Sequence, residues 1–151
     1  MNATAGQGPR HDPNPFLDTS AARAFLGQLR RATDGRTGDR LSTAIRAVTS
    51  ARSHLAVDEV EAAIAAITLL LAEYQPSLLD GVQDEPALRG WLRQVDTDLT
   101  PGRRLAAEAA LVRMEIDLDN EWFAHHEQDG SVPQVLEDLR RLRNALADAG
   151  G

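Results

Sequence analysis

The stretch VDEVEAAIAAITLLLAEY, residues 57–74, decides the fold of this chain. Every residue from 62 to 72 except Thr68 is apolar, so a helix formed there has no continuous polar face for solvent. Asp58 and Glu61 stand at the spacing of a capping box and predict that the helix begins there. Because a helix that is apolar on most sides must be covered by other elements, we expect this one at the centre of the domain.

The segments on either side of this stretch also carry helical patterns, with apolar residues three and four positions apart. Capping residues or Pro stand where the patterns begin. The further predicted helices are 19–32 with a cap at Asp18 or Thr19, 39–53, one opened by Pro86, one opened by Thr100 and Pro101, and a last one from Ser131 with Pro133 in its first turn. A short turn is expected in QPSLLDGVQDEP, residues 75–86.

The absence of strand patterns completes the prediction of fold class, since no segment sustains an alternation of period two. We therefore predict an all-α fold, a single-domain helical bundle of six or seven helices with a buried Ala- and Leu-rich central helix. The domain is expected to span residues 16–148. Residues 1–15 contain several Gly and Pro and little to bury, so they predict a flexible N-terminal segment.

The apolar stripes of the predicted helices indicate which side chains form the core. The helix opened by Thr100 is expected to be well buried, with Leu105, Ala109, Val112 and Ile116 running down it and Ala106, Ala110 and Met114 alongside. In the last helix the inward stripe is expected to be Val132, Val135, Leu136, Leu139, Leu142 and Leu146. We expect five side chains in particular to be mostly buried: Trp91, Leu105, Val112, Trp122 and Leu139.

Composition excludes several chemistries. The chain has no Cys, which excludes thiol catalysis, disulfides and cysteine-ligated metal, and all 16 of its basic residues are Arg, which excludes a Schiff-base lysine or a Walker A lysine. No nucleophile elbow and no HExxH motif is present. These missing residues and motifs predict a protein without cofactors. The beginning of the chain has no apolar signal core and no apolar stretch is long enough to span a membrane, so the sequence predicts a cytoplasmic protein.

The net charge of −7 is unevenly distributed along the chain. Up to Val57 there are eight Arg against four acids, a net of +4, and from Asp58 onward there are eight Arg against nineteen acids, a net of −11. Such asymmetry can steer a charged partner. An acidic bulk disfavours nucleic acid, because binding phosphates requires clustered positive charge.

The stretch EIDLDNEWFAHHEQD, residues 115–129, combines carboxylates with two adjacent histidines and raises the question of a metal site. If one helix ran through it, Asp117, Glu121 and His125 would share a face and could bind a divalent ion. A metal site in a bundle also needs inward carboxylates from other helices, which here offer mostly Ala and Leu. These three residues are the metal candidates of the sequence.

The same stretch has a structural explanation that needs no metal. Asp119 or Asn120 can end one helix and cap the next, with Glu121 in the first turn of a short helix. Trp122 and Phe123 then pack inward, and the histidines are half exposed. We predict this arrangement, with no bound metal.

Five segments together extend over about residues 15–147: PFLDTSAARAFLGQL, VEAAIAAITLLLAE, LAAEAALVRM, DNEWF and VLEDLRRLRNAL. In this order they resemble the bacterial family called "domain of unknown function 4259". The chain departs from the family before Pro15, where members have a Gly- and Trp-containing start, and in the Ala-rich block, where members often carry a Glu. The resemblance implies the helix order and a cap at Asp119 or Asn120. It implies no activity.

Two functions fit these observations. We expect a non-catalytic helical interaction protein, immunity-like or adaptor-like, whose acidic surface binds a basic protein such as a toxin or a nucleic-acid-binding protein. A homodimer formed through an apolar helix face is compatible with it. The alternative is a metal-binding protein or metal-dependent hydrolase that uses Asp117, Glu121 and His125.

Overall fold

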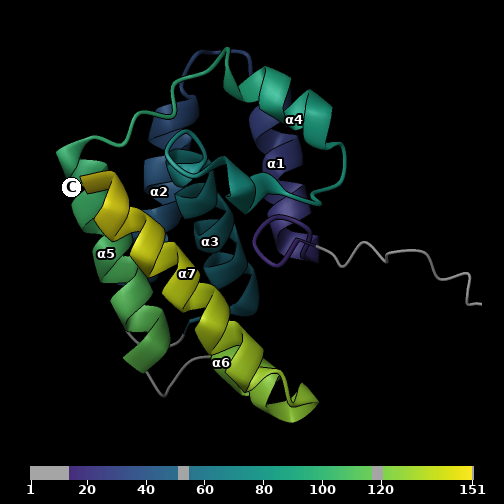
Figure 1. The fold of residues 1–151 in the computed structure, drawn as a ribbon, viewed down its shortest axis with the longest axis vertical. Helices are drawn as coiled ribbons and strands as arrows, with labels where there is room; N and C mark the ends of the chain where they lie inside the picture. Colours follow the sequence, from purple (N-terminus) through teal and green to yellow (C-terminus); the bar gives the residue numbers. More distant parts are fainter. Residues whose placement is uncertain (1–13, 51–54, 117–120, 151) are drawn as a thin grey trace, which may run out of the picture.

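A computed structural model describes residues 14–50, 55–116 and 121–150 of the chain (Figure 1). The predicted fold class is confirmed: the described residues form seven α-helices and a 3₁₀ turn, with no strand among them. The elements are α1 (Ser20–Arg31), α2 (Thr37–Ser50), α3 (Val57–Leu71), η1 (Pro76–Leu79), α4 (Glu85–Leu92), α5 (Pro101–Ile116), α6 (Glu121–Asp129) and α7 (Val132–Gly150). No helix of this described part is long and apolar enough to cross a membrane.

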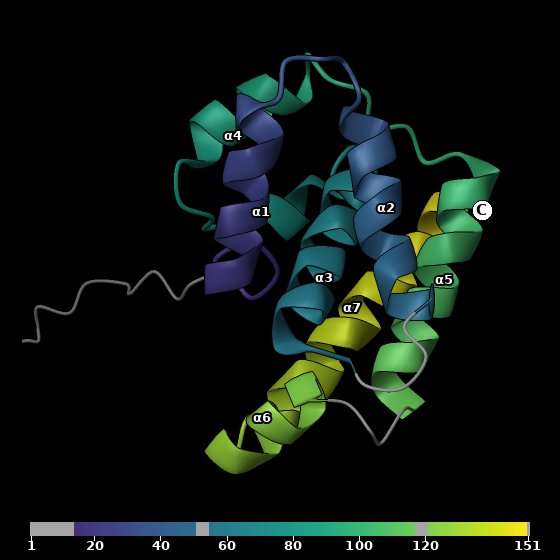
Figure 2. The same cartoon turned by 180° about the vertical axis from the view of Figure 1, so that it is seen from behind.

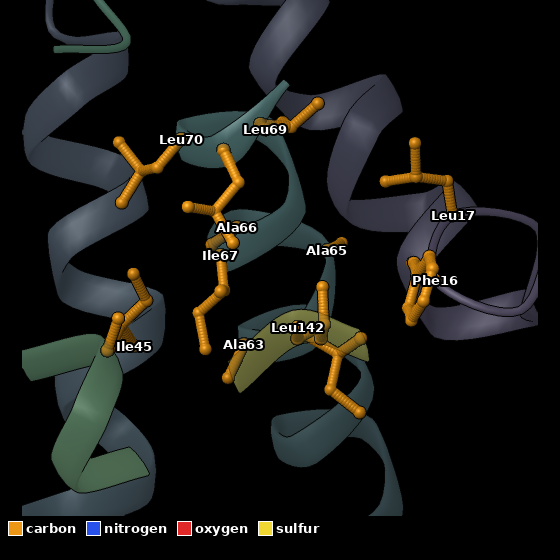
Figure 3. Packing of buried hydrophobic residues seen from close by; sticks show 14 of the residues in the cluster. Phe16, Leu17, Ile45, Ala63, Ala65, Ala66, Ile67, Leu69, Leu70 and Leu142 are labelled. Carbon is orange, nitrogen blue, oxygen red and sulfur yellow. The ribbon is translucent and has the colours of Figure 1, made fainter. Parts of the chain in front are cut away.

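Helix α3 is the centre of the bundle, as its apolar sequence predicts. It contacts α1, α2, α5, α6, α7 and η1, and Figure 2 shows α1 and α2 on either side of it, with α7 behind. Every residue from 63 to 72 is buried. In Figure 3 the labelled residues of α3 are surrounded by Ile45 of α2, Leu142 of α7, and Phe16 and Leu17 from the segment before α1.

Thr68, the polar residue in the buried part of α3, forms its side-chain hydrogen bond within the helix. The Thr68 side chain is fully buried and its hydroxyl donates to the Ile64 carbonyl at 2.8 Å. A hydroxyl that bonds back to the preceding turn can be buried without leaving an unpaired polar group. Thr68 therefore does not interrupt the core.

The start of α3 differs from the predicted capping box. The helix begins at Val57, and Glu59 accepts a 3.4 Å hydrogen bond from the Ala56 amide. The prediction that Asp58 and Glu61 form the box is therefore wrong. Glu61 instead contacts the Thr19 hydroxyl and the Ala21 amide at the start of α1, where the free amides of a helix N-terminus attract a carboxylate.

Two predicted caps are confirmed by hydrogen bonds. The Thr19 hydroxyl accepts from the Ala22 amide at 3.3 Å at the start of α1, and the Thr100 hydroxyl accepts from the Arg103 amide at 3.2 Å at the start of α5. Trp122 and Leu139 are also buried as predicted, whereas Trp91 is only half-buried against the core.

The prediction for α5 is wrong for Leu105, which is 66% exposed, and for Val112, which is 46% exposed. Ala110 and Met114 are buried as predicted, and Ala107 and Leu111 are buried beside them. The orientation follows from two bonds to α2: Arg103 Nε donates to Ser42 Oγ at 3.2 Å, and Arg113 donates to the Val48 carbonyl at 2.7 Å. Leu105 and Val112 lie about half a turn around the helix axis from Arg103, so they face away from α2.

Asn14 lies two residues before Phe16, the predicted start of the domain, and is already packed into the bundle. Asn14 is 4% exposed. Its side-chain oxygen accepts from the Phe16 and Leu17 amides at 2.9 and 3.0 Å, and its side-chain nitrogen donates to the Leu78 and Asp80 carbonyls at 2.9 and 3.0 Å. One buried amide thus joins the segment before α1 to η1.

Candidate functional site

Two of the three predicted metal candidates, Glu121 and His125, lie in the described part of the chain. Asp117 lies outside the described residues. Glu121 opens α6, where its amide donates to the Leu55 carbonyl at 2.9 Å and its carboxylate accepts from the Val57 amide at 3.5 Å. His125 is exposed, with Nε2 4.0 Å from Asp129 Oδ2. In the described ranges, no three His, Cys, Asp or Glu side chains are close enough to hold a metal ion.

Glu121 therefore has a structural position at the start of two helices. It lies in the first turn of α6, as predicted, and its carboxylate also reaches the first amide of α3. Both positions favour a negative charge, because the amide end of a helix is electropositive. The proposed caps Asp119 and Asn120 lie outside the described residues.

Helix α6 is anchored by Trp122. This residue is 3% exposed, and its ring is nearly perpendicular to the His126 ring, with the centroids 5.0 Å apart. Phe123 packs partly buried against the core. Trp122 and Phe123 thus fix the face that α6 presents to α3 and α7, and His126 lies on that face.

A small cavity of about 200 Å³ lies where α3, α6 and α7 meet the segment before α1. Its apolar lining comes from Pro15, Phe16, Ile64, Trp122, Val135, Leu139 and Leu142. Its polar lining comes from Thr19, Glu61, His126, Ser131, Gln134 and Asp138. A concave apolar base with a few polar groups around it is the usual composition of a ligand site.

Two carboxyl groups of the cavity have raised pKa values. Burial raises the pKa of Glu61 and the Asp58 charge adds to the effect, while the Thr19 hydroxyl, His125 and the Ala21 amide oppose it. Burial likewise raises the pKa of Asp138, opposed by a hydrogen bond from Gln134 at 3.0 Å and by Arg141. Each carboxylate is therefore incompletely solvated when it ionises.

His126 is held by a chain of hydrogen bonds at the cavity wall. The Ser131 hydroxyl donates to Asp129, and His126 Nδ1 lies 2.6 Å from Ser131 Oγ. Because the hydroxyl has one hydrogen, Nδ1 of the neutral ring donates to Ser131 and Nε2 remains an acceptor. Burial lowers the pKa of His126, which favours the neutral ring.

This chain of bonds is not a catalytic triad, although it contains Ser, His and an acid. In a triad the imidazole stands between the carboxylate and the nucleophile, so that it can take the hydroxyl proton. Here the Ser131 hydroxyl stands in the middle and its proton is directed to Asp129. Ser131 also precedes the first residue of α7, where its carbonyl accepts from the Val135 amide at 3.0 Å. The arrangement holds His126 beside the start of α7.

The two segments that contribute Glu61 and His126 to the cavity are acidic. Residues 55–61 and 121–131, which we call the acidic end, contain six carboxylates and no Arg: Asp58, Glu59, Glu61, Glu121, Glu127 and Asp129. The Glu121 amide joins the two segments through its bond to the Leu55 carbonyl. Helix α6 forms the lower end of the molecule in Figure 1.

Arginines neutralise carboxylates on other parts of the bundle. Arg103 lies 3.3 Å from Asp96, and Arg143 lies 2.8 Å from Glu115. Within the described part of the chain, by contrast, no arginine forms an ion pair with Asp58, Glu59 or Glu127. Among the described residues, the charges of Asp58, Glu59 and Glu127 are therefore not neutralised by an arginine ion pair.

Comparisons with known proteins identify no relative: no family model, curated protein or solved structure matches the chain.

Sequence patterns missed most of the cavity. The sequence predicts Glu61 in a capping box and Ser131 at the start of the last helix, and it predicts no role for Asp138. One signal was present, because Asp138 stands three residues after Val135 and four before Leu142, within the buried stripe of α7. A carboxylate at such a position is worth singling out, since buried carboxylates are uncommon and need partners.

Proposed function

We propose that this chain is a non-catalytic helical interaction protein that binds a basic protein partner through its acidic end. The observation that carries the proposal is the union of residues 55–61 with 121–131, which brings six carboxylates together on two contacting segments without an arginine. A basic surface on the partner would meet charges of opposite sign. Complementary charge favours encounter and fixes the orientation of a complex.

The acidic end is also well built for presenting charge. Asp58 and Glu59 lie in the first turn of α3, whose other end is buried in the core, and Glu127 lies on α6, which Trp122 anchors. Charges on rigid helices need little ordering when a partner binds, so less conformational entropy is lost. An immunity-like or adaptor-like role would use such a surface.

Self-association is compatible with this function and concerns a different face. Leu105 and Val112 are exposed on α5, together with Ala109 between them. A continuous apolar stripe on a helix surface supports contact with a second apolar surface. Sedimentation of the wild type and of a Leu105→Gln, Val112→Gln double variant would test this, since self-association through α5 predicts a larger wild-type species.

The test of the proposed function compares two variants of equal charge. One carries Asp58→Asn, Glu59→Gln and Glu127→Gln on the acidic end. The matched control neutralises three exposed carboxylates elsewhere, with Glu73→Gln, Asp84→Asn and Asp148→Asn. Extract of the native host is passed over each immobilised protein.

We expect wild type and control to retain the same basic protein and the acidic-end variant to lose it. Retention should weaken as salt rises, because exposed charges are screened beyond about 8–10 Å at physiological ionic strength. Equal retention by both variants would contradict the proposal, and so would a retained partner that is acidic.

A further inference from the structure

The cavity between α3, α6 and α7 has the size of a site for one small organic molecule. Its volume is about 200 Å³, and an apolar cavity of roughly 150 Å³ is enough to bind benzene in a protein core. The buried side chains of Ile64, Trp122 and Leu139 supply apolar lining from three helices. A ring or short aliphatic chain would therefore fit against the base of the cavity.

The polar groups of the cavity select the charge of such a molecule. Glu61 on α3 and Asp138 on α7 line it, and no arginine is among the described residues that do so. Arg141 lies over the Phe16 ring, with its guanidinium carbon 5.1 Å from the ring centroid. An anion would meet two carboxylates, whereas a cation would be attracted by both.

His126 adds an acceptor to this set. Its Nδ1 is occupied by Ser131, so the neutral ring offers Nε2 as an acceptor and carries no repelling charge. An ammonium group has three donors and no acceptor, which matches walls that present carboxylate and imidazole acceptors. The Trp122 ring is a further favourable surface for a cation.

We propose that this cavity binds a small primary ammonium ion whose apolar body is about the size of a benzene ring. The site does not depend on the partner-binding function, because Glu127 and most of the acidic end lie outside the cavity. The raised pKa values of Glu61 and Asp138 support the proposal, since a bound cation would supply the counter-charge that burial withholds.

The test uses three ligands of nearly the same shape: 2-phenylethylamine, 2-phenylethanol and 3-phenylpropionate. Binding is followed by NMR on the indole N–H signals of ¹⁵N-labelled protein. The chain has only two tryptophans. Trp122 lines the cavity and Trp91 does not, so the Trp91 signal is an internal control, assigned with a Trp91→Phe variant.

We expect saturable shifts of the Trp122 signal by the amine, with a dissociation constant of roughly 0.1–1 mM for a ligand of this size. The alcohol and the carboxylate should bind about tenfold or more weakly, because each loses the charge-assisted contacts. Asp138→Asn should weaken amine binding about tenfold, and Val135→Phe, which fills the cavity, should abolish it.

Glu127→Gln is the matched control, because it removes a carboxylate of the acidic end outside the cavity and should change the affinity less than about twofold. Glu61→Gln is a second cavity variant, used if its melting temperature shows that α1 remains docked. Three results would overturn the proposal: equal binding of all three ligands, no saturable shift by the amine, or equal loss of affinity in Glu127→Gln and Asp138→Asn.

Discussion

Replacing Asn14 with Ala tests how the segment before α1, which supplies Pro15 and Phe16 to the cavity, is held in place. The substitution removes four hydrogen bonds at once, two from the Phe16 and Leu17 amides and two to the Leu78 and Asp80 carbonyls. Each bond contributes about 0.5–1.5 kcal/mol net, and a buried group left unpaired costs about 1–3 kcal/mol. The side chain is 4% exposed, so water does not replace it freely.

We expect Asn14→Ala to lower the free energy of unfolding by about 2–4 kcal/mol, since some relaxation will recover part of the loss. For a domain of this size each kcal/mol lowers the melting temperature by about 2–4 °C. Urea denaturation followed by circular dichroism measures the difference. Asn144→Ala, an exposed change on α7, is the control and should remain within about 0.5 kcal/mol of wild type. A loss below about 0.5 kcal/mol for Asn14→Ala would refute the reasoning.

Three other predictions use the same measurements. Trp122→Ala should lower the free energy of unfolding by about 3–5 kcal/mol, because Trp122 is 3% exposed. Val112→Ala should lower it by less than about 1 kcal/mol, because Val112 is 46% exposed. Similar losses in the two variants would show that the exposed face of α5 is assigned wrongly. Burial lowers the pKa of His126 from 6.5, so the contribution of the neutral ring to stability is present above pH 6.5 and is lost as the pH falls through the lowered pKa. His126→Gln should therefore lose less stability than wild type on acidification from about pH 7.5 to about pH 5. Parallel curves of stability against pH for the two proteins would contradict this. Treatment with a chelator should leave the melting temperature unchanged, and a fall that added Zn²⁺ reverses would revive the metal hypothesis for Asp117, Glu121 and His125.

Local patterns were sufficient for the features that depend on neighbours in the sequence. The apolar run of α3 leaves a helix no alternative to burial, and Thr19 and Thr100 satisfy amides only three residues away. These contacts form within one or two turns. The helix order and the two caps were therefore predictable without a partner helix.

The face of α5 could not be read in the same way. That helix is apolar on more than one side, with Leu105 and Val112 on one stripe and Leu111 and Met114 on another. Arg103 and Arg113 select the buried stripe by bonding to α2, more than sixty residues earlier in the chain. The periodicity of one helix does not show which of its apolar faces will pack against a helix that is distant in the sequence.

The candidate site was missed for a related reason. Glu61, His126 and Asp138 belong to three helices and share no sequence motif, and their cavity exists only after α3, α6 and α7 have packed together. Asn14 likewise bonds to carbonyls sixty-four and sixty-six residues away. Such residues are recognised from their burial and their hydrogen-bond partners, which are known only from the three-dimensional structure.

The central claim, that the acidic end binds a basic partner, is tested most directly by carbodiimide cross-linking of the complex retained from the native host. The reagent joins carboxylates to amines, and because this chain has no Lys, a cross-link from its carboxylates to a lysine must end on another protein. Mass spectrometry of the digested complex then identifies the carboxylates. We predict cross-links at Asp58, Glu59 and Glu127. Cross-links confined to Glu73, Asp84 and Asp148 would contradict the claim.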